Sequence, residues 1–155
     1  MLPDPLHPAV VHLPIALAVL MPFVAVGVMA AILKGAAPAR TWGVAVALQL
    51  LLVGFAWVAV ETGEADEERV EKVVAGRHIE EHEEAAEWML WAAAGGALLM
   101  ALGLAPGRGG RIGRAAGVLA SLAVLATAVR TGQLGGELVY RHGAANAYTT
   151  SAPVP

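Results

Sequence analysis

The sequence contains no cysteine. This absence excludes disulfides, thiolate metal ligands, iron–sulfur clusters and covalently attached c-type haem. Charged residues are also scarce, at 15% of the chain, whereas 57% of the residues are hydrophobic. Such a composition is too apolar for an ordinary water-soluble domain of 155 residues, and it indicates an integral membrane protein.

Acidic residues are missing from two of the polar connectors between apolar runs. A transmembrane helix needs about 20 predominantly apolar residues. Four segments meet this length, at about 9–33, 41–61, 85–106 and 114–134. The first and third connectors carry only basic residues, namely Lys34, Arg40, Arg108, Arg111 and Arg114. Because Lys and Arg favour cytoplasmic loops, we expect these connectors inside and both termini outside.

The predicted fold class is all-α: an integral membrane four-helix bundle with its N-terminus and C-terminus outside. We assign residues 1–146 to one transmembrane domain and 147–155 to a C-terminal tail. The second connector is rich in helix formers over 64–74. It therefore predicts a short amphipathic outer helix on the surface between spans two and three, after which span three projects from the membrane.

All thirteen acidic residues and all five histidines fall in the three pieces predicted to lie outside. Placing basic residues inside requires nothing of histidine, so the one-sided histidines suggest a ligand site. His78 and His82 are four residues apart and would share one helix face. They could bind an ion or line a cofactor, or they could belong to a solvated, charge-rich helix end.

The first span offers a second candidate. His7 and His12 are five residues apart, about 140° round a regular helix, so they cannot both face one point. His12 shares a stripe with Ala16, Val19 and Phe23 and is predicted to face the bundle interior, near a kink at Pro14. The alternative is a capping His7 and an interfacial His12.

The end of the fourth span supplies further candidates. Arg130 lies about 6 Å inside the predicted outer end, where it either snorkels to headgroups or pairs with an anion. Tyr140, Arg141 and His142 follow the glycine pair 135–136 and could fold back over the outer mouth, or could form a plain tail.

Three stretches resemble a known family. They are His7-Pro8-Ala9-Val10-Val11-His12-Leu13-Pro14, His82-Glu83, and Gly135-Gly136-Glu137-Leu138-Val139-Tyr140-Arg141-His142-Gly143. With four spans in this order, about residues 3–146 resemble the bacterial membrane proteins called domain of unknown function 2231. The resemblance implies a small module of the bacterial cytoplasmic (inner) membrane with recurrent histidines on its periplasmic or outer face. It supplies no established activity, although family members look like respiratory-chain accessories. His78 is not part of the pattern.

Three functions remain open. The first is a haem b electron carrier, with His12 and His82 as ligands, His142 and Tyr140 at the mouth, and Arg130 or Arg141 near the propionates. The second is a structural or assembly subunit of a larger membrane complex, without a cofactor. The third is a zinc or copper site built from His7, His12, His78, His82 and His142. We expect an electron carrier or accessory subunit rather than an enzyme. The expected partners are the lipid bilayer, other membrane subunits or an outer redox protein, and no nucleic acid.

Overall fold

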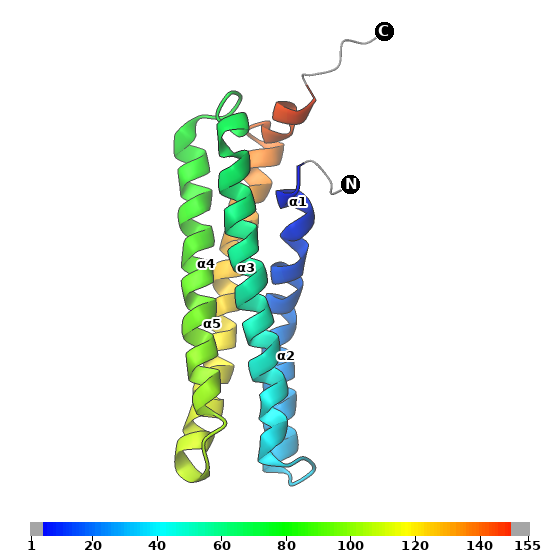
Figure 1. Ribbon diagram of the computed structural model, residues 1–155, viewed down its shortest axis with the longest axis vertical. Coiled ribbons are helices and arrows are strands. Elements are labelled where there is room, and N and C mark those ends of the chain that lie inside the picture. Colours follow the sequence, from blue (N-terminus) through cyan, green and yellow to red (C-terminus); the bar gives the residue numbers. More distant parts are fainter. Residues whose placement is uncertain (1–4, 150–155) are drawn as a thin grey trace.

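Four long helices run alternately up and down the molecule (Figure 1). The computed structural model describes residues 5–149, and every regular element within that range is helical. The elements are α1 (His7–Val10), α2 (His12–Leu33), η1 (Ala39–Thr41), α3 (Trp42–Val70), α4 (Gly76–Leu102), α5 (Gly107–Tyr140) and η2 (Ala144–Tyr148).

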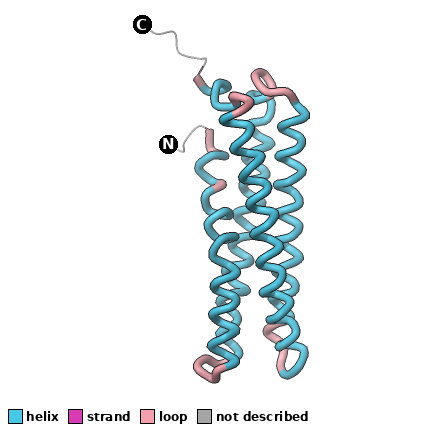
Figure 2. Tube along the Cα trace, turned by 180° about the vertical axis from the view of Figure 1, so that it is seen from behind, coloured by secondary structure: helices cyan, strands magenta, loops and turns pink. Residues whose placement is uncertain are grey.

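The long helices close into a ring. Helix α2 packs against α3 and α5, and α4 packs against the same two neighbours, while the short α1 lies against α3. The α2–α3 and α4–α5 connectors lie at one end, and the α3–α4 turn lies at the other (Figure 2). This is the predicted all-α four-helix bundle.

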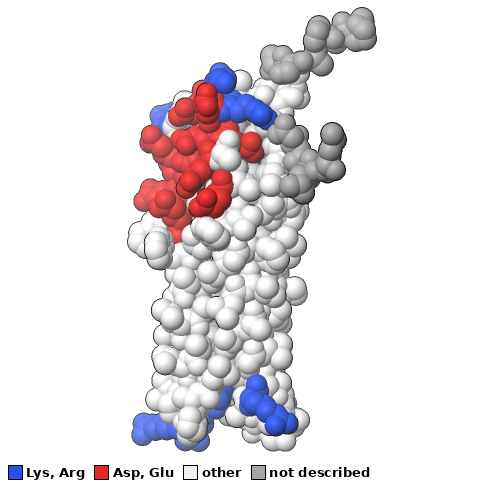
Figure 3. Space-filling view, in the orientation of Figure 1, with Lys and Arg blue, Asp and Glu red and all other residues white. Residues whose placement is uncertain are grey.

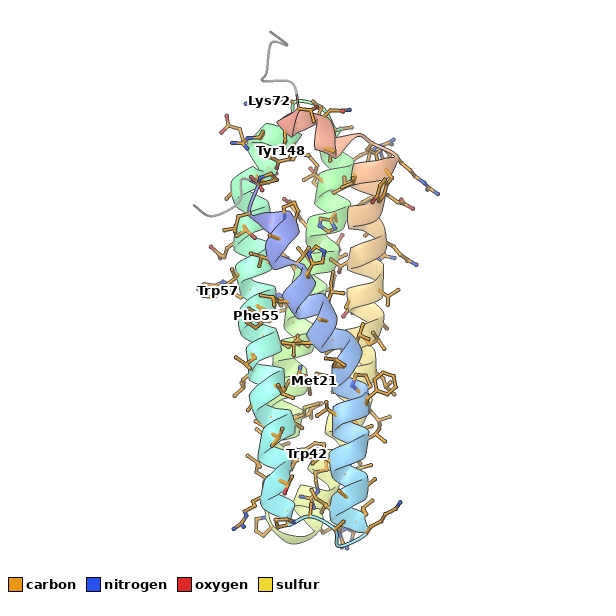
Figure 4. All side chains as sticks on the ribbon, turned by 90° about the vertical axis from the view of Figure 1, so that its right-hand side faces the viewer. Met21, Trp42, Phe55, Trp57, Lys72 and Tyr148 are labelled. Atoms are coloured by element: carbon orange, nitrogen blue, oxygen red, sulfur yellow. The ribbon has the colours of Figure 1, made fainter. Side chains whose placement is uncertain are left out.

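The outside of the bundle is apolar. All four long helices are long and apolar enough to cross a membrane by length and composition. Large apolar side chains point outward along them, for instance Phe23 (72% exposed) and Leu98 (72%). Figure 4 shows Trp57 projecting from α3, whereas Met21 and Trp42 lie between the helices. The chain is therefore an integral membrane protein in contact with the bilayer.

The segment after span two differs from the prediction. It is helical, but it is not a separate surface helix, because α3 continues without a break to Val70. Its apolar residues find partners inside the protein: Val70 and Val74 pack with Ile79 of α4 and Leu138 of α5. Burial against two helices removes the need for a membrane surface to cover them.

The end of span four also differs from the prediction. Helix α5 does not end near residue 134 but runs through Gly135 and Gly136 to Tyr140. Gly143 then turns the chain with a φ of 73°, and η2 follows. The predicted tail 147–155 begins within η2, and its residues 150–155 lie outside the described part.

At the end with the basic connectors, two side chains donate hydrogen bonds to backbone carbonyls, and two helices approach closely. Trp42 donates from Nε1 to the Met100 carbonyl at 2.8 Å, and Arg114 donates from Nη1 to the Gly103 carbonyl at 2.6 Å. A Cβ on Gly113 would lie 2.5 Å from the Gly103 nitrogen. Glycine is therefore required there for the close approach of α4 and α5.

Charge is divided between the two ends. Figure 3 shows acidic side chains gathered where α3 and α4 extend beyond their apolar runs. At the opposite end, the charged side chains that the view shows are all basic. The acidic ends of α3 and α4 surround the histidines described next.

Candidate functional site

Two histidines form a polar layer between two apolar clusters. The main core reaches this level at Ala56, Met89 and Ala128. The second cluster, which we call the outer apolar cap, comprises Val74, Ile79, Leu138 and Ala144, with Val70 packed against them. His7 and His82 contact glycines that lie between these two levels on α3 and α5.

His7 is oriented by the backbone of α3. Its Nδ1 lies 2.9 Å from the Ala59 carbonyl oxygen and 3.4 Å from Thr62 Oγ1. A carbonyl can only accept, so Nδ1 carries a proton, and in the neutral ring Nε2 then presents its lone pair. The ring lies close to Gly63, where a Cβ would be 3.2 Å from His7 Cε1.

His82 occupies the facing position on α4. A Cβ built on Gly135 would lie 3.0 Å from His82 Cε1, so the ring fits where α5 has no side chain. Its Nδ1 is buried and makes no hydrogen bond. A buried polar atom without a partner points to a group that is still to be supplied, since nearly all such atoms are paired in native proteins.

The two rings lie close together in a T-shaped arrangement. Their centroids are 6.3 Å apart and their planes are inclined by 84°. With nitrogen–metal bonds of about 2.0–2.1 Å, two imidazoles that share one ion place their ring centres roughly 5–6.5 Å apart. The observed separation of His7 and His82 fits within that range.

Burial favours the neutral form of both rings. The pair lies beyond the apolar runs, because Gly63 follows the last apolar residues of α3 and His82 stands between Glu81 and Glu83. Burial lowers the pKa of His7, against the opposing effects of the Ala59 carbonyl and Asp66. Burial also lowers the pKa of His82, the nearby His7 lowers it further, and the Thr131 backbone opposes the shift. Neutral imidazole is the form that binds metals.

The other two outer histidines form a separate pair. His78 and His142 stack with ring centroids 3.8 Å apart and planes 16° from parallel. Arg77 donates from Nε to His78 Nε2 at 3.3 Å, and Glu81 lies 3.9 Å from His78 Nδ1. His142 therefore does lie against the end of the bundle, but its partner is His78 and not His82.

Four predicted site residues lie elsewhere. His12 is exposed on α2, contrary to prediction, together with Ala16, Val19 and Phe23 of its stripe. The inward stripe consists of Pro14, Ala18, Met21 and Ala25. Arg130 is also exposed. Tyr140 is 89% exposed, and Arg141 forms a 3.0 Å ion pair with Glu137.

The residues expected around a haem do not surround one point; these are His12, His82, His142, Tyr140, Arg130 and Arg141. Among residues 5–149, no three His, Asp or Glu side chains form a metal-binding group. His7 takes the place expected for His12. The physical reason is helical spacing: Val11 has helical dihedral angles (φ −58°, ψ −23°), and His7 lies two turns before the inward-facing Pro14, whereas His12 lies on another face.

Glu83 stands among carboxylates of both acidic helix ends. Its pKa is raised first by burial, and then by the negative charges of Glu67, Glu64, Glu87 and Glu71, in that order. Mutual repulsion between these carboxylates is a cost of the bundle at neutral pH.

Comparison with known proteins gives one match. The family described as "Predicted membrane protein (DUF2231)" matches residues 3–148. No curated protein and no solved structure matches the chain. Since the match covers nearly the whole sequence, including both histidine pairs, the chain belongs to the DUF2231 family of predicted membrane proteins.

Proposed function

We propose that this protein is a small membrane redox module that binds haem b at its acidic end, where His7 and His82 would hold it. The observation that supports this most directly is the 6.3 Å separation of two imidazole rings contributed by different helices. In a chain without cysteine, bis-histidine ligation is the available low-spin arrangement.

The residues present fit such a group in two further respects. The buried Nδ1 of His82 has no hydrogen-bond partner, and Nε2 of His7 is the nitrogen left free by the bond to Ala59. Gly63 and Gly135 keep α3 and α5 free of side chains beside the two rings. A haem would supply one-electron oxidation and reduction, at a potential set by its ligands and its burial.

The chain's own residues would hold and shield this group. The Ala59 carbonyl fixes the His7 ring, as second-shell carbonyls commonly do for ligating histidine. The outer apolar cap, with Ile79 and Leu138, separates the pair from water at the end of the bundle. His12, Arg130, Tyr140 and Arg141 have no role in this arrangement, because they point away from it.

In this proposal the acidic end faces the periplasm or the outside of a bacterial inner membrane. Its partners are other membrane subunits of a respiratory-type complex, or a redox protein on that side. The basic connectors support this orientation, since basic loops are favoured in the cytoplasm.

A copper or zinc ion is the second candidate. The close packing of both rings favours it, because a Cβ on Gly63 or Gly135 would already lie 3.2 or 3.0 Å from an imidazole carbon. A single ion between the nitrogens would need less rearrangement of the helices than a porphyrin would. Imidazole suits both metals, and water or a carboxylate would complete the coordination.

Absorbance spectroscopy and elemental analysis of the purified membrane protein test both candidates. We expect a Soret band with split low-spin bands on reduction, lost in His7→Ala and His82→Ala and retained in the exposed control His12→Ala. If the protein binds copper or zinc but no haem, and this binding is lost in the same two variants, the cofactor is the metal ion and not haem. If neither is bound after expression with haem and metals supplied, the redox proposal is wrong, and a structural or assembly subunit without a cofactor remains.

A further inference from the structure

The end opposite the histidines carries positive charge that the protein does not neutralise. Lys34, Arg40, Arg108 and Arg111 are all exposed there. Neither of the described ion pairs involves any of them. The visible face of this end shows basic side chains and no acidic ones (Figure 3).

The acidic residues of the other end are too far away to neutralise these four cations. Arg40 and Glu61, the first acid of α3, are separated by 21 residues, which is about 30 Å along a helix. At physiological ionic strength charges are screened over about 8 Å. The compensating anions must therefore come from outside the protein.

Apolar side chains adjoin the cations. Leu33 is 68% exposed next to Lys34, Leu104 is 51% exposed before Arg108, and Ile112 is 59% exposed after Arg111. A phospholipid presents the complementary pair, an anionic phosphate beside acyl chains. A free phosphate ion would match only the cations.

Arg114 is separate from this surface. It is buried and donates to the Gly103 carbonyl, so it serves the α4–α5 connection. At the opposite end, the exposed cations Lys72, Arg77 and Arg141 stand among the many carboxylates of α3 and α4. That end repels anionic headgroups, because like charges dominate it.

We propose that Lys34, Arg40, Arg108 and Arg111 form a binding surface for anionic phospholipid headgroups, so that the bundle selects phosphatidylglycerol-type lipids around its basic end. This surface is independent of the histidine pair and of any cofactor there. Its consequence is a lipid-dependent anchoring of the α2–α3 and α4–α5 connectors at the membrane surface.

Electron paramagnetic resonance with spin-labelled lipids tests this proposal in vesicles that mix phosphatidylglycerol with phosphatidylcholine. We expect the full chain to immobilise labelled phosphatidylglycerol about five-fold more than phosphatidylcholine, and the preference to fall as salt is raised. The variant Lys34→Gln/Arg40→Gln/Arg108→Gln/Arg111→Gln should lose the preference. The matched control Arg69→Gln/Lys72→Gln/Arg77→Gln/Arg141→Gln removes the same number of charges from the other end and should keep it.

A charge-preserving variant guards against misfolding. Arg40→Lys/Arg108→Lys/Arg111→Lys should retain the preference, since headgroup attraction depends on charge. Equal immobilisation of the two lipids by the unchanged protein would overturn the proposal, as would loss of the preference in the charge-preserving variant. Abolition of the preference by inorganic phosphate, but not by chloride at equal ionic strength, would assign the surface to free phosphate and also overturn it.

Discussion

The imidazole rings of His78 and His142 stack with their centroids 3.8 Å apart, which joins the start of α4 to the chain that leaves α5. Directly after this contact, Gly143 reverses the backbone with a positive φ and Ala144 enters the outer apolar cap. The stack therefore holds residues 144–148, which we call the closing segment, over the layer that contains His7 and His82.

Removal of this stack should loosen the closing segment. We expect His142→Ala to speed amide hydrogen exchange in 144–148 with little change in the four long helices, because an aromatic pair contributes about 0.5–1.5 kcal/mol. Mass-spectrometric hydrogen exchange measures this effect. His142→Phe preserves a stacking ring and should keep the native rate; equal rates in His142→Ala and the unchanged protein would contradict a holding role.

A methyl group beside His82 should disturb the site. Gly135→Ala places a Cβ 3.0 Å from His82 Cε1, so we expect a loss of about 1–3 kcal/mol from overpacking. Gly132→Ala lies on the same helix with nothing within 4 Å, and it should gain about 0.5–1 kcal/mol from helix propensity. Thermal unfolding in detergent compares the two variants. Stabilisation by both would show that the ring does not depend on Gly135.

The α4–α5 connection provides a harsher test of close packing. In Gly113→Ala the new Cβ would meet the Gly103 nitrogen and the Leu102 carbonyl carbon at 2.5 Å, and a backbone cannot rotate away as a side chain can. We expect a fall in unfolding free energy of about 3 kcal/mol or more. The control Gly109→Ala has open space around it and should fold normally. Similar unfolding curves for both variants would refute the close approach of these two helices.

Neutralising Glu83 should stabilise the bundle at neutral pH. Its pKa is raised in the folded protein by burial and by four nearby carboxylates. The charged form is therefore a cost to the fold above that pKa, and acidification towards the ordinary value of 4.5 removes the cost. We expect Glu83→Gln to raise the melting temperature at pH 7 to 8, with the gain vanishing near pH 4.5. A pH-independent gain would indicate a packing effect; the exposed Glu84→Gln serves as the control.

Several features of the fold follow from local patterns in the chain. The run 41–60 has no charged residue and is long enough to cross the hydrocarbon core. In a membrane a helix satisfies all the backbone hydrogen-bonding groups of such a segment. The start of α4 near Gly76 is likewise a local feature, because the helical pattern resumes after that glycine. Neither inference depends on distant residues.

The wrong predictions concern positions where distant residues decide. The pattern of 64–74 predicts a separate surface helix, yet α3 continues to Val70, which packs against Ile79 and Leu138. Gly135 and Gly136 follow the predicted end of span four, yet α5 continues through them, and Gly135 lies against the His82 ring. The cost of glycine in a helix is modest and is easily exceeded by such contacts.

The sequence by itself determined that this is a four-helix membrane protein with its histidines and acids apart from its basic connectors, because apolar length and charge placement act locally along the chain. Only the tertiary structure decided which histidines meet. His7, two turns before the inward-facing Pro14, lies close to His82, and His12 does not, while the stack with His78 engages His142 elsewhere. Helical periodicity predicts which residues share a face, whereas these pairings depend on which face turns inward and on the relative rotation and packing of separate helices.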